Sequence, residues 1–316
     1  IGIALSEIGV GGEEVTTLSL ISEDLSSKER GKYLVVVPNM SNIGGAAIAF
    51  VFLYFNSSAL SVQKGYFIVM AFAAIILAVF TRMSVPESYR WLGVKGKTEE
   101  SAEEKKKLSI TDDGVTIRQP NFYFSLIFLG IIGVSQYLTF GLMAYIIGPF
   151  YFSQDPIFIS EIIFYASVGA SIAGFVAIFV VEWGRKKLAM FSFWGGTAIM
   201  IVILLLMNYI SDVYIFIPLL LLNMAFSEFA WATRTTLEPE LFRTSYRSTA
   251  IGLVRIFPII AYIISIYATS SFTLQQYLTF NVILWVIGGI ASLVWYLKGI
   301  ETRGINIDYR KITAKS

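Results

Sequence analysis

The sequence contains neither cysteine nor histidine among its 316 residues. The absence of cysteine excludes disulfides and thiolate metal sites. The absence of histidine removes the usual proton shuttle and the commonest metal ligand. Any proton chemistry must therefore use carboxylates, and we expect no metal and no other cofactor. There is also no nucleophile constellation and no sizeable polar domain, so the sequence is not typical of an enzyme.

Charge is scarce, because only 15% of the residues are Asp, Glu, Lys or Arg, while 56% are hydrophobic. The mean hydropathy is +0.69. A soluble chain of this length needs more polar surface than this composition supplies. The composition therefore predicts a membrane protein whose surroundings are a lipid bilayer. The net charge of +2 gives no reason to expect a nucleic-acid partner.

About nine apolar runs are long enough to cross a bilayer, which takes about 20 residues in a helix. The runs are much longer than the strands of a membrane barrel, and they do not alternate polar with apolar residues. They predict an all-α polytopic membrane protein. The expected spans are residues 1–21, 33–55, 65–81, 122–148, 158–181, 188–208, 213–235, 248–269 and 275–297.

The stretch from Thr81 to Pro120 separates two blocks of apolar runs and carries 15 of the 46 acidic and basic residues. Each charge placed in hydrocarbon costs about 2.5–3.5 kcal/mol. This stretch is therefore predicted to be a water-exposed linker, with a short surface helix over Glu99–Lys107.

Lysine and arginine are distributed unequally between the two ends of the predicted spans. If the spans alternate in direction, 22 of the 24 basic residues lie on one side and only Lys64 on the other, while Arg255 lies within a span. The positive-inside rule then makes the basic side cytoplasmic. We expect a multi-pass protein of the cell membrane with a cytoplasmic C-terminus.

Two short segments repeat each other. Glu23 and Arg30 follow the first span, and Glu240 and Arg247 follow the seventh, with the same separation of seven residues. A repeat related by an axis along the membrane normal is a known transporter construction. Matching halves would need six spans before the linker, where only three are found, so we expect three further helices upstream of Ile1.

Five motifs resemble those of the major facilitator superfamily, in its sugar porter-like and metabolite:proton symporter branch. They occur in the family's order and on the expected side of the membrane. The stretch from Val85 to Leu92 resembles the signature P-E-S-P-R-W-L after helix six. The other four are Glu182-Trp-Gly184-Arg185-Lys186-Lys187 (the D-R-x-G-R-K loop), Glu240 to Arg247 (E-L-F-P-T-x-x-R), Glu301-Thr-Arg-Gly304 (P-E-T-K-G) and the glycine-rich Gly9 to Glu13.

This resemblance implies a major facilitator fold in which the chain supplies helices four to twelve of twelve. Residues 1–81 would be the remainder of the N-terminal bundle, 82–121 the linker between bundles, 122–298 the C-terminal six-helix bundle, and 299–316 a cytoplasmic tail. The family's antiporter motif needs Gly-Pro where Met40 and Ser41 stand, which counts against a drug:proton antiporter.

Acidic residues within spans are the first candidates for a proton pathway, because an unpaired charge there is expensive. Glu13, Glu14 and Glu228 are the candidates, with Glu7 of lower rank and Arg255 a candidate partner of Glu228. The alternative interpretation is that these carboxyls only make structural hydrogen bonds to neighbouring helices.

The span 122–148 resembles helix seven of sugar porters at two positions. Gln136 is a candidate ligand for a solute hydroxyl or amide, and Tyr145 a candidate wall of the solute site. The alternative for Tyr145 is an aromatic residue of the membrane interface.

The cytoplasmic motifs imply a gate that closes the inner side by charge pairs made in one state and broken in the other. The resemblance assigns Glu23 and Glu240 as acceptors and Arg185 as a donor. The alternative is that these charges only follow the positive-inside rule. The full predicted gate is Glu23, Arg30, Glu87, Arg90, Gly184, Arg185, Lys186, Glu240 and Arg247.

The sequence and the resemblance together predict a secondary active transporter. It would move a small polar organic solute, such as a sugar or an organic acid, by alternating access with proton symport. An uncoupled facilitator and an exporter of organic cations or drugs are alternatives of the same fold. A membrane receptor is an alternative of another class.

Overall fold

The computed structural model describes residues 2–55, 58–109 and 115–310. Eight helices of this part are long and apolar enough to cross a membrane, and they match the last eight predicted spans. The elements that contain them are α2 (Arg30–Tyr54), α3 (Leu60–Ser84), α6 (Phe122–Leu142) with η1 (Met143–Ile147) and α7 (Gly148–Tyr151), α8 (Pro156–Val180) with η2 (Val181–Trp183), α9 (Arg185–Leu205), α10 (Val213–Glu240), η3 (Thr244–Tyr246) with α11 (Arg247–Ala268), and α12 (Leu274–Lys298).

The first predicted span forms helix α1 (Gly2–Asp24), but this helix is not among the eight. It carries three glutamates within the stretch that should be apolar, Glu7, Glu13 and Glu14. Because each of these charges needs a partner or water in a membrane, the position of α1 in a membrane depends on contacts with its neighbours or on water.

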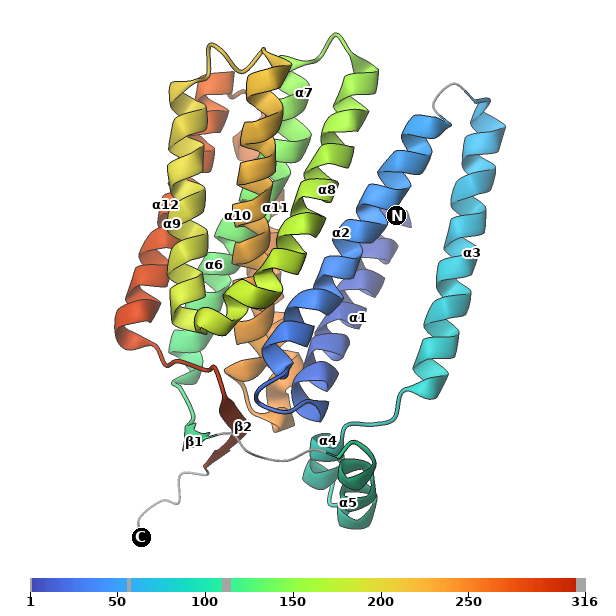
Figure 1. Cartoon of the computed structure of the whole chain (residues 1–316), viewed down its shortest axis with the longest axis vertical. Helices are drawn as coiled ribbons and strands as arrows, with labels where there is room; N and C mark the ends of the chain where they lie inside the picture. The colour runs from blue at the N-terminus through green and yellow to red at the C-terminus, as the bar shows by residue number, and fades with distance from the viewer. Residues whose placement is uncertain (1, 56–57, 110–114, 311–316) are drawn as a thin grey trace.

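The C-terminal helices α6–α12 form a tight bundle (Figure 1). In it α12 packs on α9 and α6, α10 packs on α8 and α9, and α11 packs on α6. Aromatic rings fill the core, and the ring of Phe128 stacks on Trp295 at 4.4 Å between centroids. Phe193, Trp285 and Trp295 are fully buried. Buried aromatic rings of this kind contribute much of the packing energy of the bundle.

The N-terminal helices are arranged more openly. Helix α2 packs along α8, and α1 contacts α2, α10 and α11. Helix α3 stands apart from the others in Figure 1, and none of its residues is buried within the described part of the chain. Contacts between the N-terminal helices α1–α3 and the C-terminal helices therefore run through α1 and α2.

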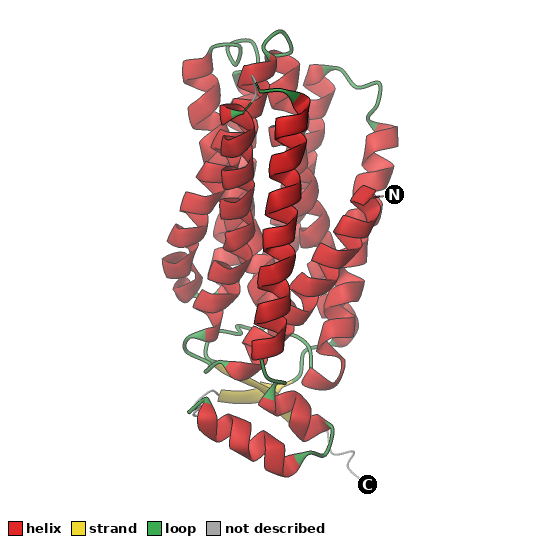
Figure 2. Cartoon of the chain, turned by 90° about the vertical axis from the view of Figure 1, so that its right-hand side faces the viewer, coloured by secondary structure: helices red, strands yellow, loops and turns green. Residues whose placement is uncertain are grey.

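The linker lies beneath one end of the bundle, which we call the linker end (Figure 2). It contains α4 (Tyr89–Val94) and α5 (Thr98–Lys107), and the latter confirms the predicted surface helix. Two short strands, β1 (Val115–Arg118) and β2 (Ile305–Arg310), were not predicted. They pair in parallel with Val115 opposite Ile305, so the tail is attached to the linker.

A glycine in the C-terminal bundle gives a test of this packing. A Cβ atom on Gly196 would overlap the ring of Trp285, whereas one on Gly252 would meet nothing within 4 Å. Overpacking a core costs about 1–3 kcal/mol. We expect Gly196→Ala to lower the midpoint of thermal unfolding in detergent. The matched variant Gly252→Ala should leave it unchanged or raise it, because alanine favours helix. Equal midpoints for the two variants would contradict the packing described.

Candidate functional site

The two repeated Glu–Arg segments meet at the linker end of the bundle. Helix α1 ends at Asp24 and α2 begins at Arg30, while α10 ends at Glu240 and α11 begins at Arg247. Each segment thus places its glutamate at the end of one helix and its arginine at the start of the next. The two turns face each other across the contact between the N-terminal and C-terminal helices.

The carboxylate of Glu240 is held by groups from three parts of the chain. Its Oε1 accepts hydrogen bonds from Arg30 Nε at 3.2 Å and from Arg185 Nη2 at 3.1 Å. Its Oε2 accepts from Arg185 Nε at 3.2 Å and from the Thr302 hydroxyl at 2.6 Å. The side chains of Arg30, Arg185 and Glu240 are at most 1% exposed. A buried charge of this kind is stable only with such partners.

The carboxylate of Glu23 makes the reciprocal contact. It forms an ion pair with Arg247, and its Oε2 accepts from the Ser88 hydroxyl at 2.5 Å. Arg247 Nε also donates to the carbonyl oxygens of Pro239 and Phe242. Each glutamate therefore binds the arginine of the other repeat. We call Glu23, Arg30, Arg185, Glu240 and Arg247 the latch.

Backbone features hold Arg185 in place. A Cβ atom on Gly31 would overlap its guanidinium, so the arginine lies directly against the α2 backbone. Gly184 has a φ of +113°, which favours glycine. The Glu301 carboxylate accepts from the backbone N–H groups of Arg185 at 2.8 Å and Lys186 at 3.1 Å, which caps the start of α9.

The motif from Val85 to Leu92, which follows α3, has one charged side chain beside the latch and one exposed to solvent. Arg90 is buried and donates from Nη1 to the carbonyl oxygen of Glu23 at 2.9 Å. Glu87 is exposed and lines a cleft between α1, the linker and the start of α11. Lys186 extends its ammonium to the carbonyl oxygen of Gly299 at 3.1 Å. The structure thus brings together the predicted gate residues, with Glu87 at its edge.

Asp24, which follows the predicted span, shows what burial does to a carboxyl beside this cluster. Burial raises its pKa to about 6, and the neighbouring Glu23 and Glu104 act in the same direction. The backbone N–H of Tyr89 and the charge of Arg90 oppose this shift in the pKa. Oδ1 of Asp24 is buried with no hydrogen-bond partner. Asp24 therefore resists ionisation in the folded protein.

This shift in the pKa of Asp24 predicts a pH dependence of stability. Between its ordinary value of 3.8 and about 6 the folded protein binds the proton more tightly than the unfolded chain, so stability falls as the pH rises through this range. We expect Asp24→Asn to raise the midpoint of thermal unfolding at pH 8 and to have little effect at pH 4. An equal effect at both pH values would contradict the assignment.

A second charge cluster lies deeper in the bundle. Arg255 on α11 forms a two-point ion pair with Glu14 on α1, of which the Nη2–Oε1 contact is 3.0 Å. Arg255 also donates from Nε and Nη2 to Glu238 Oε2 at 3.0 and 2.9 Å. Arg234 donates from Nη1 to Gln136 Oε1 at 2.9 Å, and its Nε is 3.0 Å from Glu238 Oε1 without hydrogen-bond alignment. Arg255 therefore contacts Glu14 and Glu238, and not Glu228 as the sequence suggested.

Glu228 lies at another contact between the two sets of helices. It is 4% exposed, and its Oε2 accepts from the Asn42 amide on α2 at 2.8 Å. Asn42 in turn donates to Asn39, whose own amide donates to the Ser171 carbonyl oxygen on α8. Among the described residues, an ionised carboxylate here would face an amide and no cation, which is an expensive arrangement away from water.

The remaining predicted residues do not join these clusters. Glu13 is exposed and accepts a long hydrogen bond from Thr17. Tyr145 lies in the π-helical segment η1 and is 51% exposed, with its ring edge-on to Phe140. The Glu7 side chain lies outside the described residues.

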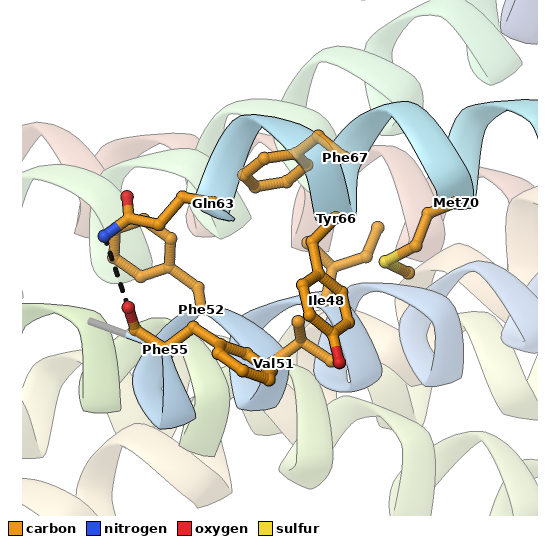
Figure 3. Close-up of a pocket in the computed structure, with 8 residues that line it drawn as sticks. All are labelled: Ile48, Val51, Phe52, Phe55, Gln63, Tyr66, Phe67 and Met70. Carbon is orange, nitrogen blue, oxygen red and sulfur yellow. Dashed lines mark hydrogen bonds between the residues drawn. The ribbon is translucent and has the colours of Figure 1, made fainter. Parts of the chain in front are cut away.

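A small apolar pocket between α2 and α3 is not a candidate solute site (Figure 3). Gln63 is its one strongly polar side chain, and the Gln63 amide is occupied by the Phe55 carbonyl oxygen at 3.2 Å. A polar solute would find no convergent hydrogen-bonding groups there.

The family model of the Major Facilitator Superfamily matches residues 1–265, and the chain therefore belongs to this superfamily. It is a multi-pass membrane transporter and not an enzyme. The predicted superfamily and fold are thereby confirmed.

Solved structures of XylE have the same fold. The proton:xylose symporter XylE bound to 6-bromo-6-deoxy-D-glucose matches with a TM-score of 0.67 and 18% identity, over 93% of this chain and 69% of that chain. A double-tryptophan mutant of XylE matches with a TM-score of 0.70 and 17% identity, over 92% of this chain and 68% of that chain. No curated protein matches the sequence.

Proposed function

We propose that the protein is a secondary active transporter of the cell membrane that moves a small polar organic solute by alternating access with proton symport. The latch carries this proposal, because its Arg30–Glu240 and Glu23–Arg247 ion pairs join the N-terminal to the C-terminal helices at the linker end of the bundle. In this proposal the linker end and the C-terminus are cytoplasmic, in agreement with the distribution of lysine and arginine.

The same proposal assigns roles to the four segments of the chain. Residues 1–81 belong to the N-terminal bundle and residues 122–298 form the C-terminal bundle. The linker 82–121 and the tail 299–316 lie at the cytoplasmic ends. The bundles rock against each other, and the latch forms when the cytoplasmic side closes.

Two observations support coupling to protons. Glu14 and Glu228 are carboxyls within the bundle, and each contacts the opposite set of helices. A carboxyl whose surroundings change with the conformation can take up a proton on one side and release it on the other. The likeness to XylE, which is a proton:xylose symporter, supports the same mechanism.

A cross-link tests alternating access. The Ser248 hydroxyl on α11 donates to the Ser19 hydroxyl on α1 at 2.9 Å, and this sequence contains no cysteine. We expect the pair Ser19→Cys and Ser248→Cys to form a disulfide on mild oxidation, because the side chains are within bonding reach. Oxidation should abolish uptake by the full-length natural protein in liposomes, and reduction should restore it. The single variants are the controls. Full uptake by the cross-linked protein would contradict the proposal.

A gradient experiment tests the coupling. Liposomes containing the full-length natural protein are given an inward proton gradient, and uptake of labelled sugars and organic acids is measured with and without a protonophore. We expect at least one solute to accumulate above its external concentration, and the protonophore to abolish this accumulation. Equilibration that the protonophore does not change would instead support a facilitator.

A further inference from the structure

The deeper charge cluster consists of two arginines and two glutamates, Glu14, Arg234, Glu238 and Arg255, which we call the quartet. Its charges sum to zero. The side chains of Glu238, Arg234, Arg255 and Glu14 are 0%, 6%, 10% and 26% exposed, respectively. A net charge left in such a place is costly, so this closed arrangement depends on neutrality.

The quartet is divided unequally between the moving parts of the proposed transporter. Glu14 is its single member on the N-terminal helices, and the other three members lie on α10 and α11. If α1 moves away from α11, the N-terminal side of the quartet carries one negative charge and the C-terminal side carries one positive charge. If the helices are to close again without the Glu14–Arg255 pair, the charge on Glu14 must be neutralised by one partner and the positive charge on α10 and α11 by another.

We propose, on the basis of the proton symport described above, that the solute is an organic monoanion whose carboxylate takes the place of Glu14 on Arg255 while a proton neutralises Glu14. In the loaded state the Glu14 carboxylate becomes a carboxylic acid, and the carboxylate of the solute pairs with the arginine. Proton and anion leave on the other side, and the Glu14–Arg255 pair forms again.

The requirement for neutrality couples the movement of the proton to the movement of the anion. The empty quartet and the doubly loaded quartet are both neutral, so both can close. A quartet with only the proton would bury a net charge of +1, and a quartet with only the anion would bury a net charge of −1. The cycle therefore carries one proton with one monoanion and moves no net charge.

The local chemistry suits a carboxylate. The planar guanidinium of Arg255 already binds the carboxylate of Glu14 at two points, and this geometry would serve a solute equally. Gln136, fixed by Arg234, and the half-exposed Tyr137 on α6 offer polar and aromatic contacts.

Several charged and polar groups surround the Glu14 carboxyl and influence its protonation. They are the charges of Arg255 and Arg234 and the side chain of Trp231. Glu13 is the neighbouring acid on α1, and Glu238 shares Arg255 with Glu14.

Proton movement in vesicles distinguishes the solute classes. The full-length natural protein is placed in liposomes with a pH dye inside, and three classes of probe are added outside. The probes are gluconate and quinate, the neutral sugars xylose and glucose, and the cation choline. The potential is clamped with potassium and valinomycin, and protein-free liposomes correct for leakage. We expect gluconate or quinate to acidify the lumen, at a rate that an imposed potential does not change.

The other outcomes of this experiment are decisive. Acidification by a sugar or by choline, or a rate that follows the potential, would overturn the inference but leave proton symport intact. No proton movement with any probe would remove the proposed symport, and the inference with it.

Substitution of Glu14 separates this role from a structural one. Glu14→Gln is permanently neutral, so the anion-loaded quartet can close but the empty quartet cannot. We expect this variant to keep exchange of labelled gluconate or quinate for unlabelled anion and to lose proton-driven net uptake. Arg255→Gln should lose both. Arg303→Gln, which removes a half-exposed arginine 3.4 Å from Glu182, is the matched control and should keep both.

Two results would overturn the assignment to Glu14. One is loss of exchange together with uptake in a Glu14→Gln variant that still elutes as a folded, monodisperse protein. The other is a Glu228→Gln variant that loses proton coupling while Glu14→Gln keeps it. If Glu14→Gln does not fold, the liposome experiment on the natural protein still tests the inference, because it measures whether uptake of the anion with a proton moves net charge.

Discussion

A charge that is buried away from water must have a partner, and this constraint governs the contact between the two sets of helices. Arg30, Arg185, Glu240 and Arg247 are at most 1% exposed, and each is bound by an oppositely charged group. Removing one member of such a pair costs about 3–5 kcal/mol, because the other charge remains buried. The N-terminal and C-terminal helices can therefore approach at this end only when both contribute their charges in register.

The crossing of the two pairs explains how such a contact can also be broken. On separation, Glu240 keeps Arg185 and Thr302, both of which lie on the C-terminal side. Glu23 keeps the Ser88 hydroxyl, and Arg247 keeps the carbonyl oxygens of Pro239 and Phe242. Glu240, Glu23 and Arg247 therefore each retain a partner when the helices separate. Arg30 does not, since its other acceptor is the carbonyl oxygen of Ile305 in the tail, and water must solvate its guanidinium instead. The tail and its strand pairing with the linker are thus part of the closed contact.

Sequence patterns predicted the helices and all five charged residues that form the latch, but not the neutral groups that bind the buried carboxylates. Long apolar runs specify helical spans, because a helix satisfies all its backbone hydrogen bonds internally within hydrocarbon. Glu23, Arg30, Glu240 and Arg247 could be recognised because their spacing repeats. Ser88, Thr302 and Asn42 could not, because serine, threonine and asparagine are common, and only the fold brings them to a carboxylate. The Arg234–Glu238 pair had a signal, opposite charges four residues apart near the end of a span, which is a known helical pairing. Glu87 was predicted as a gate residue from its motif, but its side chain is exposed, because a motif position does not fix which way a side chain points.

In the proposed cycle the contact at the linker end must open each time, and ion pairs suit such a contact better than apolar packing does. Replacing a buried ion pair by well-packed apolar residues is often neutral or stabilising by about 1–4 kcal/mol, so the net attraction of a buried pair is small. An apolar interface at the linker end would hold the closed state strongly and would expose apolar surface to water whenever it opened. The latch instead specifies one closed arrangement through geometry, while hydration of the separated charges offsets most of its attraction. In the proposed transport cycle, two states that differ by only a few kcal/mol can then be shifted by the binding of a proton and a solute.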